Sequence, residues 1–163
     1  MNFLKRIFGN SKPIKQSISV KKYPDRFFFE TYNRVNNSYS ARSKEITILD
    51  INPSDIEIGK TILKHLSLSK NIKKITNEER KENDELYKKI TGLKSIKAQM
   101  KDSLCVSIHC ENNQIEFSPT INGGTTGNRK GYNYLNEEKI VIKNNKDFQI
   151  IGKSLKLALE KCR

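Results

Sequence analysis

A stripe of apolar residues near the C-terminus is the clearest periodic pattern in the chain. Its members recur at intervals of three and four residues, which is the period of one face of a helix. We therefore expect an amphipathic helix over about residues 146–161, with a buried face made of Phe148, Ile151, Leu155, Ala158, Leu159 and Cys162.

A second stripe follows a helix-start signal. Asn52 can cap a helix, Pro53 suits the first helical position, and Asp55 adds negative charge to the first turn. Residues 53–68 are therefore predicted to be a helix whose buried stripe is Ile58, Ile62 and Leu66.

Two further helices are predicted in the middle of the chain. Thr76 and Glu79 form a capping-box pattern that opens a charged helix ending at about Ile90. Its apolar face is thin, so it should lie on the surface. Residues 68–74 are expected to be a linker, and residues 94–101 a short helix after Gly92.

Short β-rich segments occupy much of the remainder. Residues 16–22 and 26–32 flank the turn residues Tyr23-Pro24-Asp25 and are predicted to pair as a hairpin. Residues 104–118 are predicted to form another hairpin, and residues 45–49 and 139–142 single strands. Residues 33–43 are expected to be a polar loop, and residues 122–127 a flexible one.

Strands that come in groups, rather than alternating with helices, favour an antiparallel arrangement. We therefore predict an α+β fold, a mostly antiparallel β-sheet with helices packed on it, in one domain spanning residues 1–163. Residues 1–15 are expected to be a short amphipathic turn or a frayed, flexible N-terminal segment.

The net charge of +13 is unevenly distributed along the chain. Residues 1–44 carry ten Lys/Arg against two acids, whereas the rest of the chain is close to balanced. A basic surface attracts nucleic acid, anionic lipid or an acidic protein, and charge alone does not choose among them. A Lys/Asn/Ile-rich composition that reflects the codon bias of the host is an equally good explanation.

Three cysteines, an odd number with no paired spacing, favour reduced thiols in a cytosolic protein. The N-terminus lacks the continuous apolar run of a signal peptide, because Lys5 and Arg6 interrupt it, and no later segment approaches a membrane span. We therefore expect a cytoplasmic location and no membrane association.

Fragments of catalytic motifs occur, but none is complete. The triplets that begin at Gly59 and Gly152 resemble the end of a phosphate-binding P-loop, yet the required earlier glycine is Ser54 in one and Asp147 in the other. Both triplets also lie inside predicted helices, so we assign the two glycines to helix–sheet packing.

The cysteines and histidines also lack a recognised spacing. Cys105 and His109 would face one side of a strand and Cys110 the other, so core thiols explain them better than a metal site. A Cys105 or Cys110 nucleophile paired with His65 is a weak enzyme hypothesis. We expect no enzyme activity, metal, cofactor or small-molecule substrate.

The run Phe27-Phe28-Phe29 beside Arg26 could stack nucleic-acid bases. In a strand, Phe27 and Phe29 share one face and Phe28 takes the other, so packing in a core explains the run more simply. Direct nucleic-acid binding by the basic N-terminal region is nevertheless the main alternative function.

About the last 75 residues carry a family resemblance. In order, they contain Gly92-Leu93-Lys94-Ser95, a strand pair ending in Pro119-Thr120, the strand Ile140-Val141-Ile142, and a closing helix beginning Ile151-Gly152-Lys153-Ser154-Leu155. This order resembles the CdiI-type immunity proteins of contact-dependent growth inhibition (CDI) systems.

The resemblance implies a non-enzymatic inhibitor made in the cytosol. Its partner would be the C-terminal toxin domain of a cognate CdiA effector, with a nuclease as the favoured toxin. In this family a toxin hairpin can add to the sheet of the immunity protein, a mode in which main-chain bonds supply affinity. A basic immunity protein would suit an acidic toxin surface and associate with it quickly.

The loop after Thr120 is the candidate toxin-binding region. It combines backbone freedom with Arg and Tyr, residue types that often anchor interfaces. A long connecting loop without a binding role is an equally good explanation on composition alone. The candidate contact residues are Asn122, Arg129, Lys130, Tyr132 and Tyr134.

Overall fold

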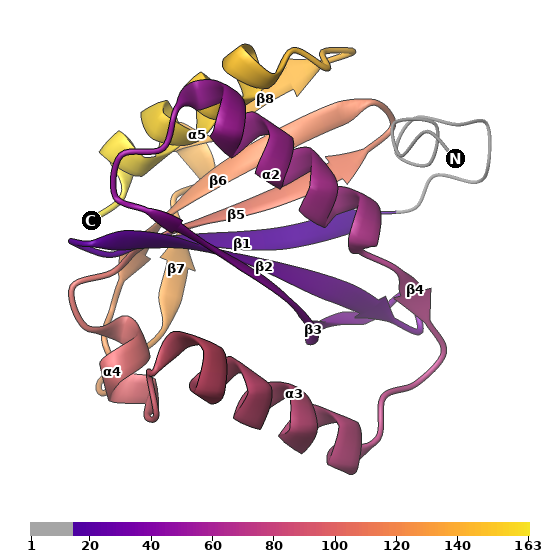
Figure 1. The fold of residues 1–163 in the computed structure, drawn as a ribbon, viewed down its shortest axis with the longest axis vertical. Helices are drawn as coiled ribbons and strands as arrows, with labels where there is room; N and C mark the ends of the chain where they lie inside the picture. The colour runs from indigo at the N-terminus through magenta and orange to yellow at the C-terminus, as the bar shows by residue number, and fades with distance from the viewer. Residues whose placement is uncertain (1–14) are drawn as a thin grey trace.

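The computed structural model describes residues 15–163 of the chain. The expected N-terminal segment therefore lies outside the described residues, apart from Lys15. Figure 1 shows a twisted β-sheet with helices α2 (Asp55–Leu68) and α5 (Phe148–Lys161) on one face and α3 (Asn77–Thr91) on the other. The α+β class predicted from the sequence is confirmed.

The sheet is almost entirely antiparallel. Its strand order is β3-β2-β1-β5-β6-β7, while β8 also pairs with β6 and the short β4 runs parallel to β2. The strands are β1 (Gln16–Lys22), β2 (Arg26–Val35), β3 (Tyr39–Asp50), β4 (Asn71–Ile72), β5 (Leu104–Glu111), β6 (Gln114–Asn122), β7 (Tyr132–Tyr134) and β8 (Ile140–Lys143).

Two predicted connections are wrong because they contain strands. The polar loop expected at residues 33–43 is the end of β2 and the start of β3, joined by a tight turn in which Asn36 and Asn37 have φ of 48° and 53°. Asparagine tolerates this left-handed conformation, so a polar segment can turn without a loop. The linker expected at residues 68–74 contains β4, which pairs with the end of β2.

The return of the chain after β6 was predicted only in part: β8 (Ile140–Lys143) confirms the strand expected at 139–142, whereas β7 was not expected. β6 extends to Asn122, and after the loop 123–131 the chain comes back along the same edge as β7, a 3₁₀ turn (Asn136–Glu138) and β8. β7 has only three residues, which is too short for an alternating pattern to be visible in the sequence.

The helices begin where side chains cap them. The Ser54 hydroxyl accepts a hydrogen bond from the Glu57 amide, so α2 starts at Asp55, and the predicted start at Asn52 and Pro53 is wrong by two residues. The Thr76–Glu79 capping box is present at the start of α3, as predicted. The short helix α4 (Ile96–Met100) lies within the predicted range 94–101.

The main core lies between the sheet and the pair α2 and α5. The stripe Ile58, Ile62 and Leu66 is completely buried there, and Ile151 and Leu155 face it from α5. The prediction that Gly59 and Gly152 pack on the sheet is wrong. Each packs on the other helix: a Cβ on Gly59 would lie 2.0 Å from the Phe148 carbonyl oxygen. Among residues 15–163, no helix is both long and apolar enough to cross a membrane.

Candidate protein-binding face

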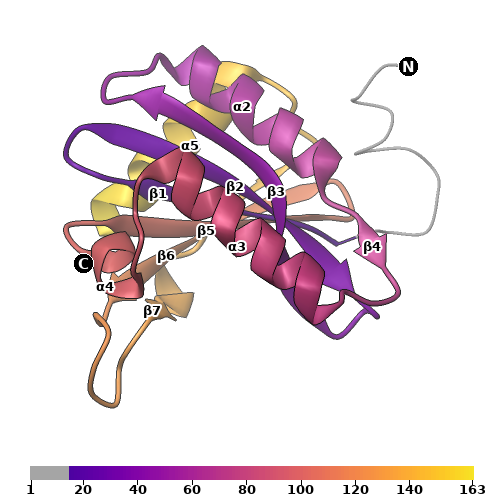
Figure 2. The same ribbon diagram turned by 60° about the horizontal axis from the view of Figure 1, so that its bottom comes forward.

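The sheet face opposite α2 and α5 is only partly covered. Helix α3 packs on β3, and Figure 2 shows it lying across one side of this face while β7 and its loop project at the other side. The strands of this face and β7 line a hollow of about 230 Å³, which we call the open-face groove. Its lining residues are Ser17, Ile18, Ser19, Tyr32, Ser40, Cys105, Ser107, His109, Thr120, Tyr132 and Tyr134.

The floor of the groove is polar because of strand alternation. Ser17 pairs with His109 and Ser19 with Ser107 across the β1–β5 ladder. Side chains two residues apart share a face of a strand. The intervening Ile18 and Ile108 are therefore directed to the core, where both are buried, and the hydroxyls line the opposite face.

His109 joins two hydroxyls of this floor. Its Nδ1 lies 2.6 Å from the Ser17 hydroxyl and its Nε2 lies 3.2 Å from the Ser107 hydroxyl. Burial, and then the positive charge of Lys15, lower the pKa of His109 to about 4. The imidazole is therefore neutral at pH 7 and can accept one hydrogen bond while donating the other.

A buried ion cluster on the same sheet face holds α3. The Glu30 carboxylate is 2.9 Å from the Lys21 ammonium and 3.2 Å from the Arg42 guanidinium. The guanidinium stacks 3.9 Å from the ring centre of the fully buried Tyr87, which belongs to α3. Burial alone would lower the pKa of Lys21. The neighbouring Glu30 carboxylate outweighs burial and raises this pKa well above its usual value.

The structure separates the candidate contact residues by role. Tyr132 and Tyr134 line the groove, the Tyr132 hydroxyl lying 2.6 Å from that of Ser103, and Tyr134 is 56% exposed. Arg129 and Lys130 are exposed in the β6–β7 loop. Asn122 is engaged within the protein, because its amide donates to the carbonyls of Met100 (2.6 Å) and Ser103 (2.9 Å).

The model of the CDI immunity protein family, CdiI, matches residues 16–162, which is nearly the whole described domain. The chain belongs to this family. The match confirms the resemblance found in the C-terminal part and extends it back to residue 16, through a region where the sequence motifs are weaker.

Two solved structures share the fold of this CdiI-family chain. One is a protein of unknown function from Neisseria meningitidis, with TM-score 0.76 and 17% identity, covering 94% of this chain and 98% of that one. The other is in a CdiA-CT/CdiI toxin and immunity complex from Yersinia pseudotuberculosis, with TM-score 0.75 and 18% identity, covering 93% and 100%. No curated protein matches the chain.

The thiols of this CdiI-family chain are not activated. Cys105 is buried in the floor of the groove and Cys110 in the core, and burial raises the pKa of each to about 11. His65, the predicted partner, belongs to α2 and lies on the sheet face opposite Cys105, where its ring nitrogens hydrogen-bond with the hydroxyls of Thr31 and Thr47. No group of three or more metal-ligating side chains occurs among residues 15–163.

The three phenylalanines are not available to bases. Phe27 and Phe29 lie in the core, as predicted, and Phe28 packs on the opposite face against Tyr23 and Tyr87. All three are at most 3% exposed. The base-stacking hypothesis for this run is therefore wrong.

Sequence reasoning missed the floor of the groove. The signal was present as polar residues at alternate positions, Ser17, Ser19 and Lys21 on one segment and Ser107 and His109 on another. It could have predicted a polar sheet face, but not that the two segments are neighbours.

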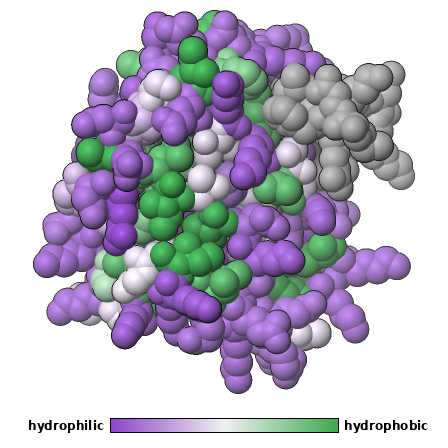
Figure 3. All heavy atoms as spheres, in the orientation of Figure 1, coloured by the Kyte–Doolittle hydropathy of each residue, from purple (hydrophilic) through white to green (hydrophobic). Residues whose placement is uncertain are grey.

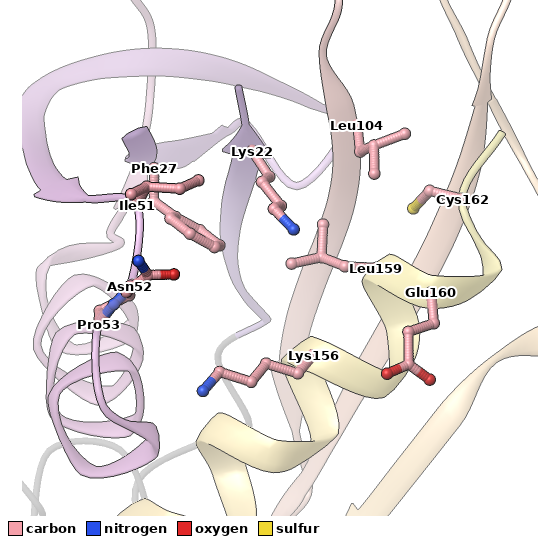
Figure 4. A pocket seen from close by; sticks show the side chains of 10 residues that line it. All are labelled: Lys22, Phe27, Ile51, Asn52, Pro53, Leu104, Lys156, Leu159, Glu160 and Cys162. Carbon is pink, nitrogen blue, oxygen red and sulfur yellow. The ribbon is translucent and has the colours of Figure 1, made fainter. Parts of the chain in front are cut away.

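A second hollow lies on the α2–α5 side, near the C-terminus of α5, and has a volume of about 530 Å³. Figure 4 shows Phe27, Leu104 and Leu159 lining it, together with Lys22 and Lys156. Lys156 is held by Asp55 at 2.6 Å. None of the candidate contact residues reaches this hollow.

Proposed function

We propose that this chain is an immunity protein that binds the C-terminal toxin domain of a cognate CdiA effector and neutralises it. The observation that carries the proposal is the family match over residues 16–162. The fold shared with a chain of the Yersinia pseudotuberculosis toxin and immunity complex supports it. The chain then acts by occupying a surface of the toxin, without catalysing a reaction itself.

The open-face groove and the β6–β7 loop are the proposed toxin contact. Tyr134 is exposed, and Arg129 and Lys130 project from a loop whose base is closed by two main-chain hydrogen bonds between Gly123, Gly124 and Gly131. A loop held at its base loses little conformational freedom on binding. Tyrosine and arginine at such a site provide contact area at low entropic cost.

Strand β8 is the proposed place for an added toxin strand. It pairs with β6 on one side, and no other described strand pairs with it. Val141 is 43% exposed, whereas Ile140 and Ile142 pack on the core. A strand with an unpaired edge can accept a partner hairpin through main-chain hydrogen bonds.

We infer from the family resemblance that the toxin is a nuclease and that neutralisation takes place in the cytosol. The nuclease inference is tested by purifying the toxin domain encoded immediately upstream and assaying it on DNA and RNA, and the cytosolic one by fractionating cells that produce the chain. The chain should abolish the activity at a one-to-one ratio.

Calorimetric titration against that toxin domain is the deciding experiment. Tight one-to-one binding together with loss of toxicity establishes immunity, whereas absence of binding rejects the proposal. Hydrogen exchange on the complex then locates the contact: the outward amides of residues 140–143 should become protected if a toxin strand adds there. Unchanged exchange at β8 would contradict strand addition while leaving immunity in place.

A further inference from the structure

The short helix α4 and the β6–β7 loop lie side by side at one end of the molecule, although about 30 residues separate them in the sequence. Figures 1 and 2 both show this arrangement, with the loop and β7 next to α4. Asn122 and Tyr132, at the two ends of the loop, hydrogen-bond to the α4 end and to Ser103 just after it. The loop and helix are thus tied to one another at the base.

This juxtaposition concentrates positive charge. Residues 92–103 contain three lysines and residues 123–131 contain an arginine and a lysine, against the single acid Asp102. All five cations are exposed, and none of the ion pairs within the described residues involves them. We call this surface the α4–loop patch: Lys94, Lys97, Lys101, Arg129 and Lys130.

An apolar side chain accompanies the charges. Ile96, in the first turn of α4, is 66% exposed, the largest exposure among the large apolar residues of the described chain. Figure 3 shows that hydrophilic side chains cover most of the face seen in Figure 1, with apolar ones gathered near its centre. Ile96 shares α4 with the exposed Lys97, and interfaces combine apolar contacts with polar groups in this way.

We propose that the α4–loop patch docks an acidic surface of the protein partner, which steers association and seats Ile96. This inference rests on the proposed function, because it assigns a chemistry to the toxin side of the interface. Opposite charges on two proteins raise the association rate through long-range attraction and fix their relative orientation.

The observations favour a protein over nucleic acid as the occupant. Tight sequence-independent binding of a single strand uses aromatic side chains as stacking platforms beside the cations. The Phe27–Phe29 run that could have supplied them is buried, and the exposed apolar residue of the patch itself is aliphatic; the exposed Tyr134 on the neighbouring β7 offers a single ring and not a row of them. An aliphatic side chain finds a complementary pocket on a protein more readily than on a phosphate backbone.

Charge reversal tests the steering. The double variant Lys97→Glu, Arg129→Glu should slow association with the toxin domain about tenfold at low salt, with the difference shrinking as salt is added. The control, Lys64→Glu, Lys153→Glu, changes the net charge equally at exposed positions of α2 and α5. It should alter the rate less than twofold, and equal slowing by both variants would overturn the proposal.

A second probe works without the toxin. A poly-L-glutamate peptide should shift the amide resonances of residues 94–101 and 129–130, and a DNA duplex of the same charge should bind more weakly. Shifts distributed over all basic residues, or tighter DNA binding, would overturn the proposal. If the peptide binds at the patch and the toxin does not bind the chain, the proposed function is rejected, while the patch is supported as a binding site for acidic protein.

Discussion

Gly59 and Gly152 each lie against the first residue of the other's helix. A Cβ on Gly59 would stand 2.0 Å from the Phe148 carbonyl oxygen, and a Cβ on Gly152 would stand 2.0 Å from that of Asp55. The first turns of α2 and α5 therefore cross with their backbones in contact. Both glycines occur in the repeated pattern Ile-Gly-Lys-Thr/Ser, and Ser54 and Asp147, five residues before them, are the N-caps.

Replacing either glycine should destabilise the fold. In an exposed helix Gly→Ala usually adds about 1 kcal/mol of stability. Here Gly59→Ala should instead lower the free energy of unfolding by about 2 kcal/mol or more, because the methyl group meets backbone that must shift. Urea unfolding measures the change, with Lys64→Ala on the exposed side of α2 as the control. A more stable Gly59→Ala variant would contradict the close crossing.

The ion cluster beneath α3 should be sensitive to loss of one partner. Lys21→Met removes the cation 2.9 Å from the fully buried Glu30 carboxylate and should cost about 3–5 kcal/mol of unfolding free energy. Adding Glu30→Gln should recover part of the loss, because the unpaired charge disappears. Lys88→Met, which breaks the exposed pair with Glu85, should leave the urea midpoint unchanged. Equal effects of Lys21→Met and Lys88→Met would show that the buried pair is not a structural anchor.

Mild acid should weaken the fold through its two histidines. Burial is the main cause that lowers the pKa of both His65 and His109 from 6.5 to about 4, so the unfolded chain binds more protons between these values. The two neutral histidines contribute their full share of the free energy of unfolding above pH 6.5. This share is lost as the pH falls towards 4, and the total loss is on the order of a few kcal/mol.

Urea unfolding at a series of pH values measures this loss. His109→Gln should make the decline between pH 6.5 and 4 shallower than in the wild type, whatever its effect at pH 8. An unchanged slope would show that His109 titrates normally in the folded protein.

The cysteines should resist alkylation in the native state. Thiolate is the reactive form, and burial raises the pKa of Cys105 and Cys110 to about 11. At pH 8 iodoacetamide should modify the half-buried Cys162 first and leave the other two intact, while all three react in urea. Mass spectrometry of tryptic peptides reports each site. Rapid native labelling of Cys105 would reopen the nucleophile hypothesis.

Two of the candidate contact residues should respond oppositely to substitution. Asn122→Ala leaves the Met100 and Ser103 carbonyls without their donor and should reduce stability by about 1–3 kcal/mol. Tyr134→Ala should leave stability within about 0.5 kcal/mol of the wild type and weaken toxin binding about tenfold or more. Thermal unfolding measures stability and calorimetry measures toxin binding. A toxin affinity unchanged by Tyr134→Ala would show that Tyr134 does not contact the toxin.

Most of the secondary structure could be predicted from local pattern. The stripes of α2 and α5, the capping box of Thr76 and Glu79, and both main hairpins depend on residues a few positions apart, so the sequence displays them directly. The wrong predictions also have local causes. Residues 33–43, expected to be a loop, are two strands joined by a tight turn with asparagines at positive φ, and β7 is too short to show alternation.

What the sequence by itself determined is therefore the class of fold, the buried stripes, the absence of a complete catalytic motif and, through the order of its C-terminal motifs, the family. Only the tertiary structure decided which faces meet. It placed Gly59 against Phe148, joined Ser17 and Ser107 to His109 in one polar floor, and set helix α4 beside the β6–β7 loop. These relationships join segments that are far apart in the sequence. They follow from strand order and helix crossing, which are set by burial over the fold as a whole. They therefore leave no periodic pattern in any one segment.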